Sequence, residues 1–473
     1  MKTKTTVLIG LGCGASLGLA TARAVETDFA WKTNVTAEAD GGRDFGLLGN
    51  DNSREGYLDA TPWAHFQFSP QWSAFVRLRL FAPTGAVLPN GNDNNNVGAS
   101  SSAFLGLKEA WIDYGGLTSY PDESIRLGRQ RIREDDAMFW DQDLDALRWI
   151  FNTTLLQTEI GVGHELSTYR TDDVKLPPDQ KDRTYAFGTL SGEWHPQQRI
   201  GVRVVHADDD GDQPQIGQRV DSQTKLVNGH MTWAGFFLDN HYYDGPDSPA
   251  LAYTGSMTWL LGSQRTALVD PSNFVIGRDS GNLHAWAADV GLRYRLPFER
   301  APVQIGASYT YSSGGHAGDM SDQFAQTGLQ SNYSTFTGTR ALINRFTDSY
   351  RAELGNLKVA SAFASLNLGE WDTSVIWSRY HRVNGDAPVV VDNILAEPNT
   401  ISRDLGNGYD LVLTRYLGGK TEPQSWLVAD EHQSSLRLRG SVFDPGAASL
   451  VGRVVRNPEV SPQRRPPGPA DAG

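Results

Sequence analysis

Strict alternation between apolar and polar side chains runs along most of this chain. Between Ala288 and Leu296 every second residue is apolar or aromatic, and the residues between them are polar, charged or glycine. The segments 251–261 and 303–312 repeat the pattern. Side chains of a β-strand point alternately to the two faces of a sheet, so a period of two residues indicates strands. The sequence therefore predicts an all-β protein whose strands each have one apolar and one polar face.

The number of strands and their connections decide the architecture, because a soluble sandwich alternates as well. Strands of about ten residues joined by alternately tight turns and long loops are typical of outer-membrane barrels. We predict seventeen such strands, centred near Trp31, Ala64, Val76, Glu109, Leu127, Trp149, Ile160, Phe187, Val202, Thr232, Gly255, Val290, Ala307, Phe363, Ile376, Val412 and Leu438. The sequence thus favours a transmembrane antiparallel β-barrel.

Connection lengths and aromatic residues support a barrel over a sandwich. The predicted short connections are 68–72, 194–199 and 298–302, and the predicted long ones are 82–102, 207–225, 262–283 and 312–354. We expect the last of these to fold over or into the mouth, because it is too long for a simple connector. Aromatic girdles at the two membrane interfaces are expected from Trp111, Tyr114, Trp140, Trp194, Trp259, Trp371 and Tyr416.

The N-terminal segment reads as a signal peptide rather than as structure. Residues 1–24 combine two lysines, an apolar stretch and an Ala-x-Ala cleavage site, and they contain Cys13, the only cysteine. The expected mature chain has no disulfide and a net charge of −16, against −13 for the whole sequence. No later apolar run reaches the roughly 18 residues of a membrane-spanning helix. We expect one barrel domain over residues 25–446.

Arginines on the polar face of a strand are predicted to line the lumen. In the segment 435–442, leucine and valine alternate with Arg437 and Arg439, which we therefore expect to point inward. Around Arg129 and Arg131 the pattern is ambiguous, because residues of the same parity include Leu127. Guanidinium groups hold carboxylates bidentately and stay charged, so an arginine lining selects anions.

Signals for metal binding or catalysis are weak. Asp208, Asp210 and Asp212 place oxygen ligands at alternate positions, but no bidentate glutamate follows at the spacing of a calcium loop, so a solvated acidic loop is favoured. The chain contains no nucleophile elbow, zinc-protease or phosphate-loop sequence. We predict no enzyme activity, no cofactor and no nucleic-acid partner.

Several runs of the sequence resemble the alginate export family of outer-membrane porins. They are 108–118 (KEAWIDYGGLT), 127–133 (LGRQRIR), 169–172 (YRTD), 181–184 (KDRT), 326–332 (QTGLQSN), 336–340 (FTGTR) and 353–357 (ELGNL). The resemblance extends in order from about Phe29 to Gly446. It implies a monomeric barrel of 18 strands with an arginine-rich constriction and long gating loops.

The resemblance also implies particular pore residues. By position, Lys108, Arg131 and Arg437 match basic pore residues, Glu109, Asp141 and Asp172 match acidic partners, and Asp143 matches a polar one. Thr61, Tyr333 and Leu342 stand where relatives can carry arginine, and Asn34 stands where they can carry lysine. Arg340 and Arg345 lie close enough in sequence to replace some of that charge.

Together these features predict a porin that exports the anionic polysaccharide alginate across a Gram-negative outer membrane. Lumen carboxylates would balance the basic lining, and periplasmic secretion machinery is an expected partner beside membrane lipid. A general uptake porin for small anions or sugars, and a barrel hydrolase, remain alternatives.

The C-terminus departs from the barrel pattern. After Gly446 the family pattern requires a closing strand that ends in an aromatic residue, whereas residues 447–473 are rich in proline and arginine. Proline cannot donate to a β-ladder, so the last strand is predicted to be degenerate or missing. A non-native tail, as a frameshift after about Ala448 would produce, accounts for the abrupt change.

Overall fold

The computed structural model describes residues 25–42, 45, 53–85, 102–172, 174–178, 180–221, 224–270, 272–298, 301–316, 319, 321–391, 394, 398–417 and 434–449. These residues form 19 β-strands and one short 3-10 helix, η1 (Gly245–Asp247). Seventeen strands form a single sheet, while β14 (Tyr333–Ser334) and β15 (Ile343–Asn344) pair only with each other. Within the described residues, none of the helical structure is long and apolar enough to span a membrane. The signal peptide predicted at 1–24 lies outside the described residues.

Every strand of the large sheet is antiparallel to its neighbours, which follow in chain order. The strands are β1 (Glu26–Asp40), β2 (Ser53–Gln67), β3 (Trp72–Pro83), β4 (Phe104–Tyr114), β5 (Glu123–Arg133), β6 (Asp141–Asn152), β7 (Leu156–His164), β8 (Arg183–His195), β9 (Gln198–Asp209), β10 (Val227–Asp239), β11 (Leu251–Val269), β12 (Val275–Arg295), β13 (Val303–Ser312), β16 (Leu357–Leu368), β17 (Trp371–Arg382), β18 (Asp404–Leu417) and β19 (Ser434–Pro445). All seventeen predicted strand centres fall within these strands, one in each.

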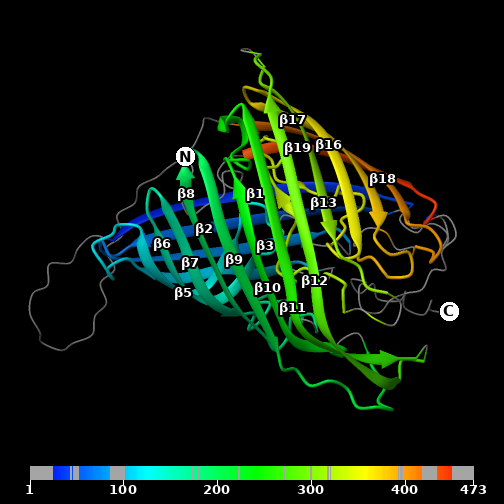
Figure 1. The fold of residues 1–473 in the computed structure, drawn as a ribbon. Coiled ribbons are helices and arrows are strands. Elements are labelled where there is room, and N and C mark those ends of the chain that lie inside the picture. The colour runs from blue at the N-terminus through cyan, green and yellow to red at the C-terminus, as the bar shows by residue number, and fades with distance from the viewer. Residues whose placement is uncertain are drawn as a thin grey trace, which may run out of the picture.

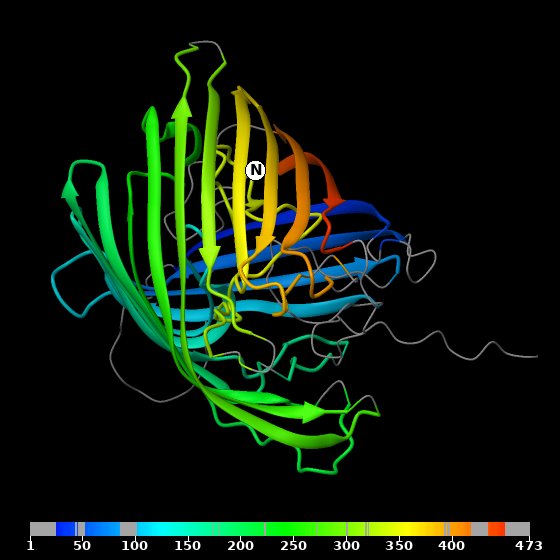
Figure 2. The same cartoon turned by 45° about the vertical axis from the view of Figure 1, so that its right-hand side comes forward.

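The sheet curls around a central space, so that β19 returns toward β1 and β2 (Figures 1 and 2). Phe45, which follows β1, stacks on Phe443 of β19 with 6.2 Å between the ring centroids. No ladder joins β19 to β1 in the part of the chain that the structure describes. Residues 450–473, to which the prediction of a degenerate closing strand applies, lie outside that part.

The outer surface of the curled sheet is apolar, as the alternation predicts for a face in contact with lipid. On β19, Leu436, Leu438 and Val442 are more than 60% exposed, at 68%, 63% and 64%. On the inner side of β16 to β18 small hydroxyl residues are fully buried, among them Ser374, Ser378 and Thr414. A membrane barrel shows this inversion of a soluble protein, with apolar residues outside and polar residues inside.

Two predicted details of the connections are wrong. The segment 262–283 is no long loop, because β11 and β12 stay paired from Gly262 opposite Leu283 to Leu268 opposite Gly277 and project beyond the wall as a hairpin (Figure 2). On the short-turn side, the connections 240–250 and 418–433 are also much longer than tight turns.

Three aromatic residues assigned to girdles face the lumen instead. Trp111, Trp140 and Tyr416 are each at most 5% exposed, whereas Trp194, Trp259 and Trp371 point outward as predicted. Trp111 has the same parity as Glu109, and parity decides which face of a strand a side chain occupies. Tyr114 packs against the exposed Trp72 with the two rings tilted by 40° and 4.7 Å between ring centroids.

The lumen is filled largely by residues 313–356, here called the lumenal segment, which confirms that this connection folds inward. It bonds to the inner wall at many strands: Trp233 of β10 donates to the Ala325 carbonyl (2.7 Å), Ser365 of β16 donates to the Thr337 carbonyl (2.6 Å), and the Ser349 amide donates to Ser441 of β19 (2.7 Å). Its Phe324, Phe346 and Tyr350 belong to the main hydrophobic cluster. The core of this protein thus lies inside the barrel.

Candidate functional site

The tip of the β5–β6 hairpin leaves the wall and enters the lumen. The ladder between β4 and β5 ends at Ala110 opposite Arg129, but β5 and β6 remain paired to Arg133 opposite Asp141. Beyond that point β4 bonds to a different segment, since the Leu107 amide donates to the Tyr169 carbonyl at 3.0 Å. Residues near Tyr169 therefore complete the wall where the hairpin departs.

The inserted hairpin has one apolar and one charged face. Ile132, Trp140 and Leu144 pack in the same cluster as Phe187 of β8 and Trp233 of β10. The opposite face carries a row of charged side chains: Arg129, Arg131, Arg133, Asp141 and Asp143. The charged face of the hairpin therefore points away from β8 to β10.

Gly128 removes the ambiguity that the sequence pattern left around Arg129. Its φ of +126° is a conformation that other residues rarely adopt, and an added Cβ would lie 2.3 Å from the Ala110 carbonyl oxygen. Leu127 is consequently 61% exposed toward lipid while Arg129, two residues on, is only 4% exposed. A local irregularity of this kind re-aims the side chains that follow it.

A β-bulge in β4 directs two adjacent charged residues to the same face. The β3–β4 register shifts so that Arg77 lies opposite Glu109 while Leu78 lies opposite Leu107. Lys108 is the extra residue, and both it and Glu109 are buried on the inner side. The structure thus brings Lys108 and Glu109 beside Arg131. The Arg131 amide donates to the Glu109 carboxylate at 3.3 Å, and the positive charge of Lys108 attracts the Asp143 carboxylate.

Asp141 joins the hairpin to the lumenal segment. Its carboxylate accepts from Arg131 Nε at 2.7 Å, from Arg133 Nη1 at 2.5 Å and from Ser331 Oγ at 2.6 Å. Its amide donates to the Leu329 carbonyl at 2.6 Å. The Asp141 carboxylate therefore fixes the orientation of Arg131, a predicted pore residue, and of its neighbour Arg133.

Arg129 lies between two carboxylates. Its Nη1 is 3.4 Å from Asp145 and its Nη2 is 3.7 Å from Glu165, and its guanidinium lies over the ring of Tyr169 at 4.7 Å. Burial raises the pKa of Glu165 to about 7, although Arg129 acts in the opposite direction. Glu165 follows β7 and lies outside the membrane-spanning strands.

We expect the Glu165→Gln protein to be more heat-resistant than the parent at pH 8 and nearly equal to it at pH 4, below the ordinary pKa of a glutamate. The folded pKa of about 7 exceeds the ordinary value of 4.5, so the folded state binds the proton more tightly. Stability of the parent therefore falls as the pH rises through that interval. The measurement is the temperature at which the folded band disappears on gels, with the exposed Glu193→Gln as control. A difference of equal size at both pH values would contradict the expectation.

Arg439 and Arg437 of β19 face the lumenal segment, as predicted. Arg439 contacts Asp348 at 3.4 Å and donates to the Leu342 carbonyl at 2.6 Å. Arg437 Nε donates to Thr414 Oγ1 at 3.1 Å. Burial acts to raise the pKa of Asp348, but Arg439 and Arg351 outweigh it and lower that pKa. Asp348 is thus an ionised counter-charge for the arginines of β19.

Arg340, Arg345 and Asp172 are each engaged in a close ion pair. Arg340 binds Asp372 at 2.9 Å, and Arg345 binds Asp289 at 2.5 Å. Asp172 pairs with Arg170, whose guanidinium lies 3.7 Å from the centroid of the Phe104 ring. Arg345 is enclosed, so it braces the lumenal segment against β12 rather than lining open space.

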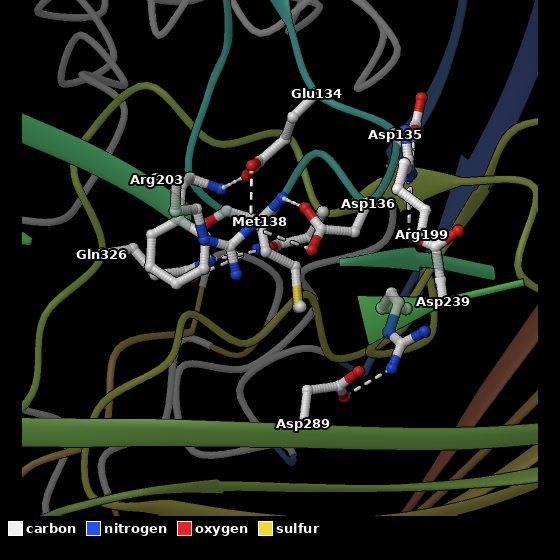
Figure 3. A network of polar contacts seen from close by, with 12 residues as sticks. Glu134, Asp135, Asp136, Met138, Arg199, Arg203, Asp239, Asp289 and Gln326 are labelled. Carbon is white, nitrogen blue, oxygen red and sulfur yellow. Dashed lines mark hydrogen bonds and ion pairs between the residues drawn. The ribbon is translucent and has the colours of Figure 1, made fainter. Parts of the chain in front are cut away.

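Sequence reasoning missed further inward-facing arginines, among them Arg77, Arg79, Arg199 and Arg203. Arg79 binds Asp59 through Nε at 3.1 Å and Nη2 at 2.7 Å, and Arg77 binds Glu109 at 3.1 Å. Arg199 and Arg203 of β9 bind the three acidic residues at the hairpin tip (Figure 3). The missed signal is the same alternation that identified Arg437, since each of these arginines alternates with apolar residues in its strand.

The weak metal candidate is altered by the structure. In the part of the chain that the structure describes, Asp208 and Asp210 gather with His230 and not with Asp212. His230 Nδ1 lies 2.7 Å from Asp208, and both side chains are substantially exposed. An exposed acidic group of this kind carries no evidence for an ion.

Comparison with known proteins identifies the family. The model of the alginate export family matches residues 25–453. Alginate production protein AlgE of Pseudomonas aeruginosa is 36% identical, covering 94% of this chain and 92% of that protein, and AlgE of Pseudomonas syringae pv. tomato is 32% identical, covering 95% and 96%. Among solved structures, Acinetobacter baumannii OccAB1 gives a TM-score of 0.49 at 10% identity, covering 90% of this chain and 91% of that one. By its sequence matches, the chain belongs to the alginate export family.

Proposed function

We propose that this protein is a porin of the Gram-negative outer membrane that carries alginate, a linear polyuronate, out of the cell. The family match and the alginate production proteins among its relatives support this function. No enzymatic family is indicated, and nothing favours a hydrolase or a general uptake porin. Residues 1–24 would direct export of the chain, and periplasmic secretion machinery would deliver the polymer.

The observation that carries the proposal is the charged cluster where the hairpin leaves the wall. Lys108 and Glu109 come from β4, and Arg131, Asp141 and Asp143 come from the β5–β6 hairpin; they lie together on the inner side. The lumenal segment is bonded to β10, β12 and β16 to β19, and to the end of the hairpin through Arg133, Asp141 and residues 138–139. We infer that the polymer passes between the inner face of β2 to β4 and the charged face of the hairpin.

Paired arginines suit a polymer that must bind and then leave. Each guanidinium has five N–H donors, and an internal carboxylate occupies only some of them. A polymer carboxylate can therefore exchange with Asp or Glu without leaving the arginine uncompensated. Permeation requires binding that is favourable but weak, and this exchange provides it.

We expect Arg437→Ala to raise the concentration of polymannuronate that half-blocks the channel by about tenfold, the loss of one charge-assisted contact. Current through single channels in planar bilayers measures the blockade, with neutral dextran as the comparison polymer. The matched control is Arg415→Ala, which lies opposite Leu436 at the same level of the neighbouring strand but has a 47% exposed side chain on the outer face. An unchanged half-blocking concentration in a correctly folded Arg437→Ala protein would refute the assignment.

A further inference from the structure

Two arginines of β9 form a basic row on the inner face of the sheet, beside β10 and the tip of the hairpin. Arg199 and Arg203 are four residues apart in one strand, so their side chains share a face and their Cα atoms lie roughly 13 Å apart. Both guanidiniums approach the ring of Phe237, at 5.5 Å and 5.9 Å from its centroid, and Arg203 also lies 3.9 Å from that of Phe139. The rings hold the guanidiniums flat and leave their N–H edges for anions.

Three consecutive acidic residues of the chain occupy this row (Figure 3). Arg203 Nη1 lies 2.7 Å from Glu134 and 3.2 Å from Asp136, and Arg199 Nη2 lies 2.5 Å from Asp135. These residues form the tip of the inserted β5–β6 hairpin. The tip therefore presents a short run of carboxylates along a single chain, which is the chemistry of a linear polyuronate.

The acidic tip leaves some of the N–H donors of Arg203 without a hydrogen bond. Arg203 is 3% exposed, yet among the described residues its Nε and Nη2 have no hydrogen-bond partner. Buried N–H groups of a guanidinium are costly to leave unpaired. A carboxylate approaching edge-on would bond two of these groups at once, which the tip does not do.

We propose that Arg199 and Arg203 form a binding site for a linear polycarboxylate, and that the residues Glu134 to Asp136 are its internal competitor. The ligand class, a stretch of polyuronate, rests on the proposed function. The tip occupies the site in the closed form, and the transported polymer displaces it.

The three tip carboxylates lie in different surroundings. Burial raises the pKa of Glu134 well above its ordinary value, and the neighbouring Asp136 adds to this. Burial acts to raise the pKa of Asp136 as well, but Arg203 outweighs it, so that pKa is lowered. Asp135 is half exposed and pairs with Arg199. Asp135 and Asp136 are therefore the residues to neutralise.

The tip also adds a carboxylate to a cavity at the short-turn end, which faces the periplasm in outer-membrane barrels. This cavity of about 260 Å³ is lined by Arg199 together with the carboxylates of Asp135, Glu193, Asp239 and Asp244. Arg199 is also paired with Asp239 of β10 at 2.8 Å. Displacing the tip would remove Asp135, one of the four carboxylates of this cavity, and leave Asp239 as the remaining partner of Arg199.

The decisive experiment compares channel blockade in matched variants. We expect D135N/D136N to lower the half-blocking concentration of polymannuronate by about tenfold, because the polymer no longer competes with two carboxylates. Adding R199Q/R203Q to that variant should abolish the gain. The control D122N/E370Q removes two exposed carboxylates at the same end and should leave blockade at the parent value.

Outcomes separate this inference from the proposed function. If the parent channel is blocked and D135N/D136N is blocked no better, the internal competitor is refuted while alginate export stands. If polymannuronate does not block the parent at all, the proposed function fails. Blockade by polyglutamate is then measured for the same variants. Stronger blockade of D135N/D136N than of the parent, lost on adding R199Q/R203Q, would support a polycarboxylate site. Equal blockade of D135N/D136N and the parent would refute it.

Displacement of the tip can be measured separately, because the expected mature chain has no cysteine. Met138 is buried beside Asp136, whose carboxylate accepts from its amide at 3.0 Å. We expect a cysteine-reactive reagent to label Met138→Cys at least several-fold faster in the presence of polymannuronate, with neutral dextran having no effect. Equal labelling rates with the two polymers would contradict displacement.

Discussion

Removing residues 325–349 of the lumenal segment and joining the ends with a short Gly-Ser linker is expected to raise single-channel conductance several-fold. These residues occupy the lumen but belong to none of the ladders of the wall. The inner surface that their removal uncovers combines polar residues, such as Ser365 of β16 and Thr414 of β18, with apolar ones, such as Phe363 and Ile376. Water can solvate the polar part, and the ladders of the wall are intact, so we expect the barrel to stay folded with reduced stability.

A matched control removes a segment of similar size outside the lumen. Residues 263–282 form the projecting part of the β11–β12 hairpin, and Gly262 lies opposite Leu283 in the ladder. Joining these two residues with an Asn-Gly turn shortens the hairpin and preserves its register. We expect its conductance to stay at the parent value. Parent-like conductance and noise in the 325–349 deletion, once its folding is verified, would show that the lumenal segment does not restrict the pore.

The wall of this barrel could be predicted from sequence because its signal is local. Lipid and water select opposite side chains on alternate positions, so a strand such as 288–296 identifies itself within a few residues. The inward direction of Arg437 and Arg439 follows from the same rule and is confirmed. The outward direction of the large leucines on β19 follows from it as well.

The filling of the barrel was predictable only in outline. Length alone indicated that residues 312–354 fold inward, but the inserted β5–β6 hairpin gave no such signal. Both of its faces are buried in protein, so Ile132 and Leu144 on one side look like lipid-facing residues. Only the unusual φ of Gly128 shows where the parity changes, and a glycine in a sequence does not announce its conformation.

Ion-pair partners could not be read from periodicity, because the chain brings them from distant positions. Arg203 binds Glu134, which is 69 residues away, and Arg133 reaches the Tyr333 carbonyl across 200 residues. Alternation shows that an arginine faces inward, but it does not show whether a carboxylate or a polymer will meet it. The resemblance to a family supplied Lys108, Glu109 and Asp141, and the bulge in β4 explains how adjacent residues share one face.

The edges of β1 and β19 determine how efficiently the barrel assembles. β1 pairs with β2 along its length and β19 with β18, while the outer residues of β19 are exposed as lipid-facing residues are. Each backbone group left unpaired in the hydrocarbon region costs several kcal/mol. An added strand between β19 and β1 would pair both edges at once.

We therefore expect assembly to improve several-fold when residues 450–473 are replaced by a turn and a strand of about ten alternating residues that ends in an aromatic, the length of a spanning strand. The replacement begins after Ser449, because Ala448 is fully buried and its amide bonds to the Asp404 carbonyl at 2.7 Å. The control carries the same residues shuffled so that the alternation is lost. The measurement is the fraction of protein that forms a heat-modifiable, protease-resistant barrel. Equally efficient assembly from the present sequence would mean that its own C-terminal residues already close the wall, since no barrel can keep two open edges in lipid.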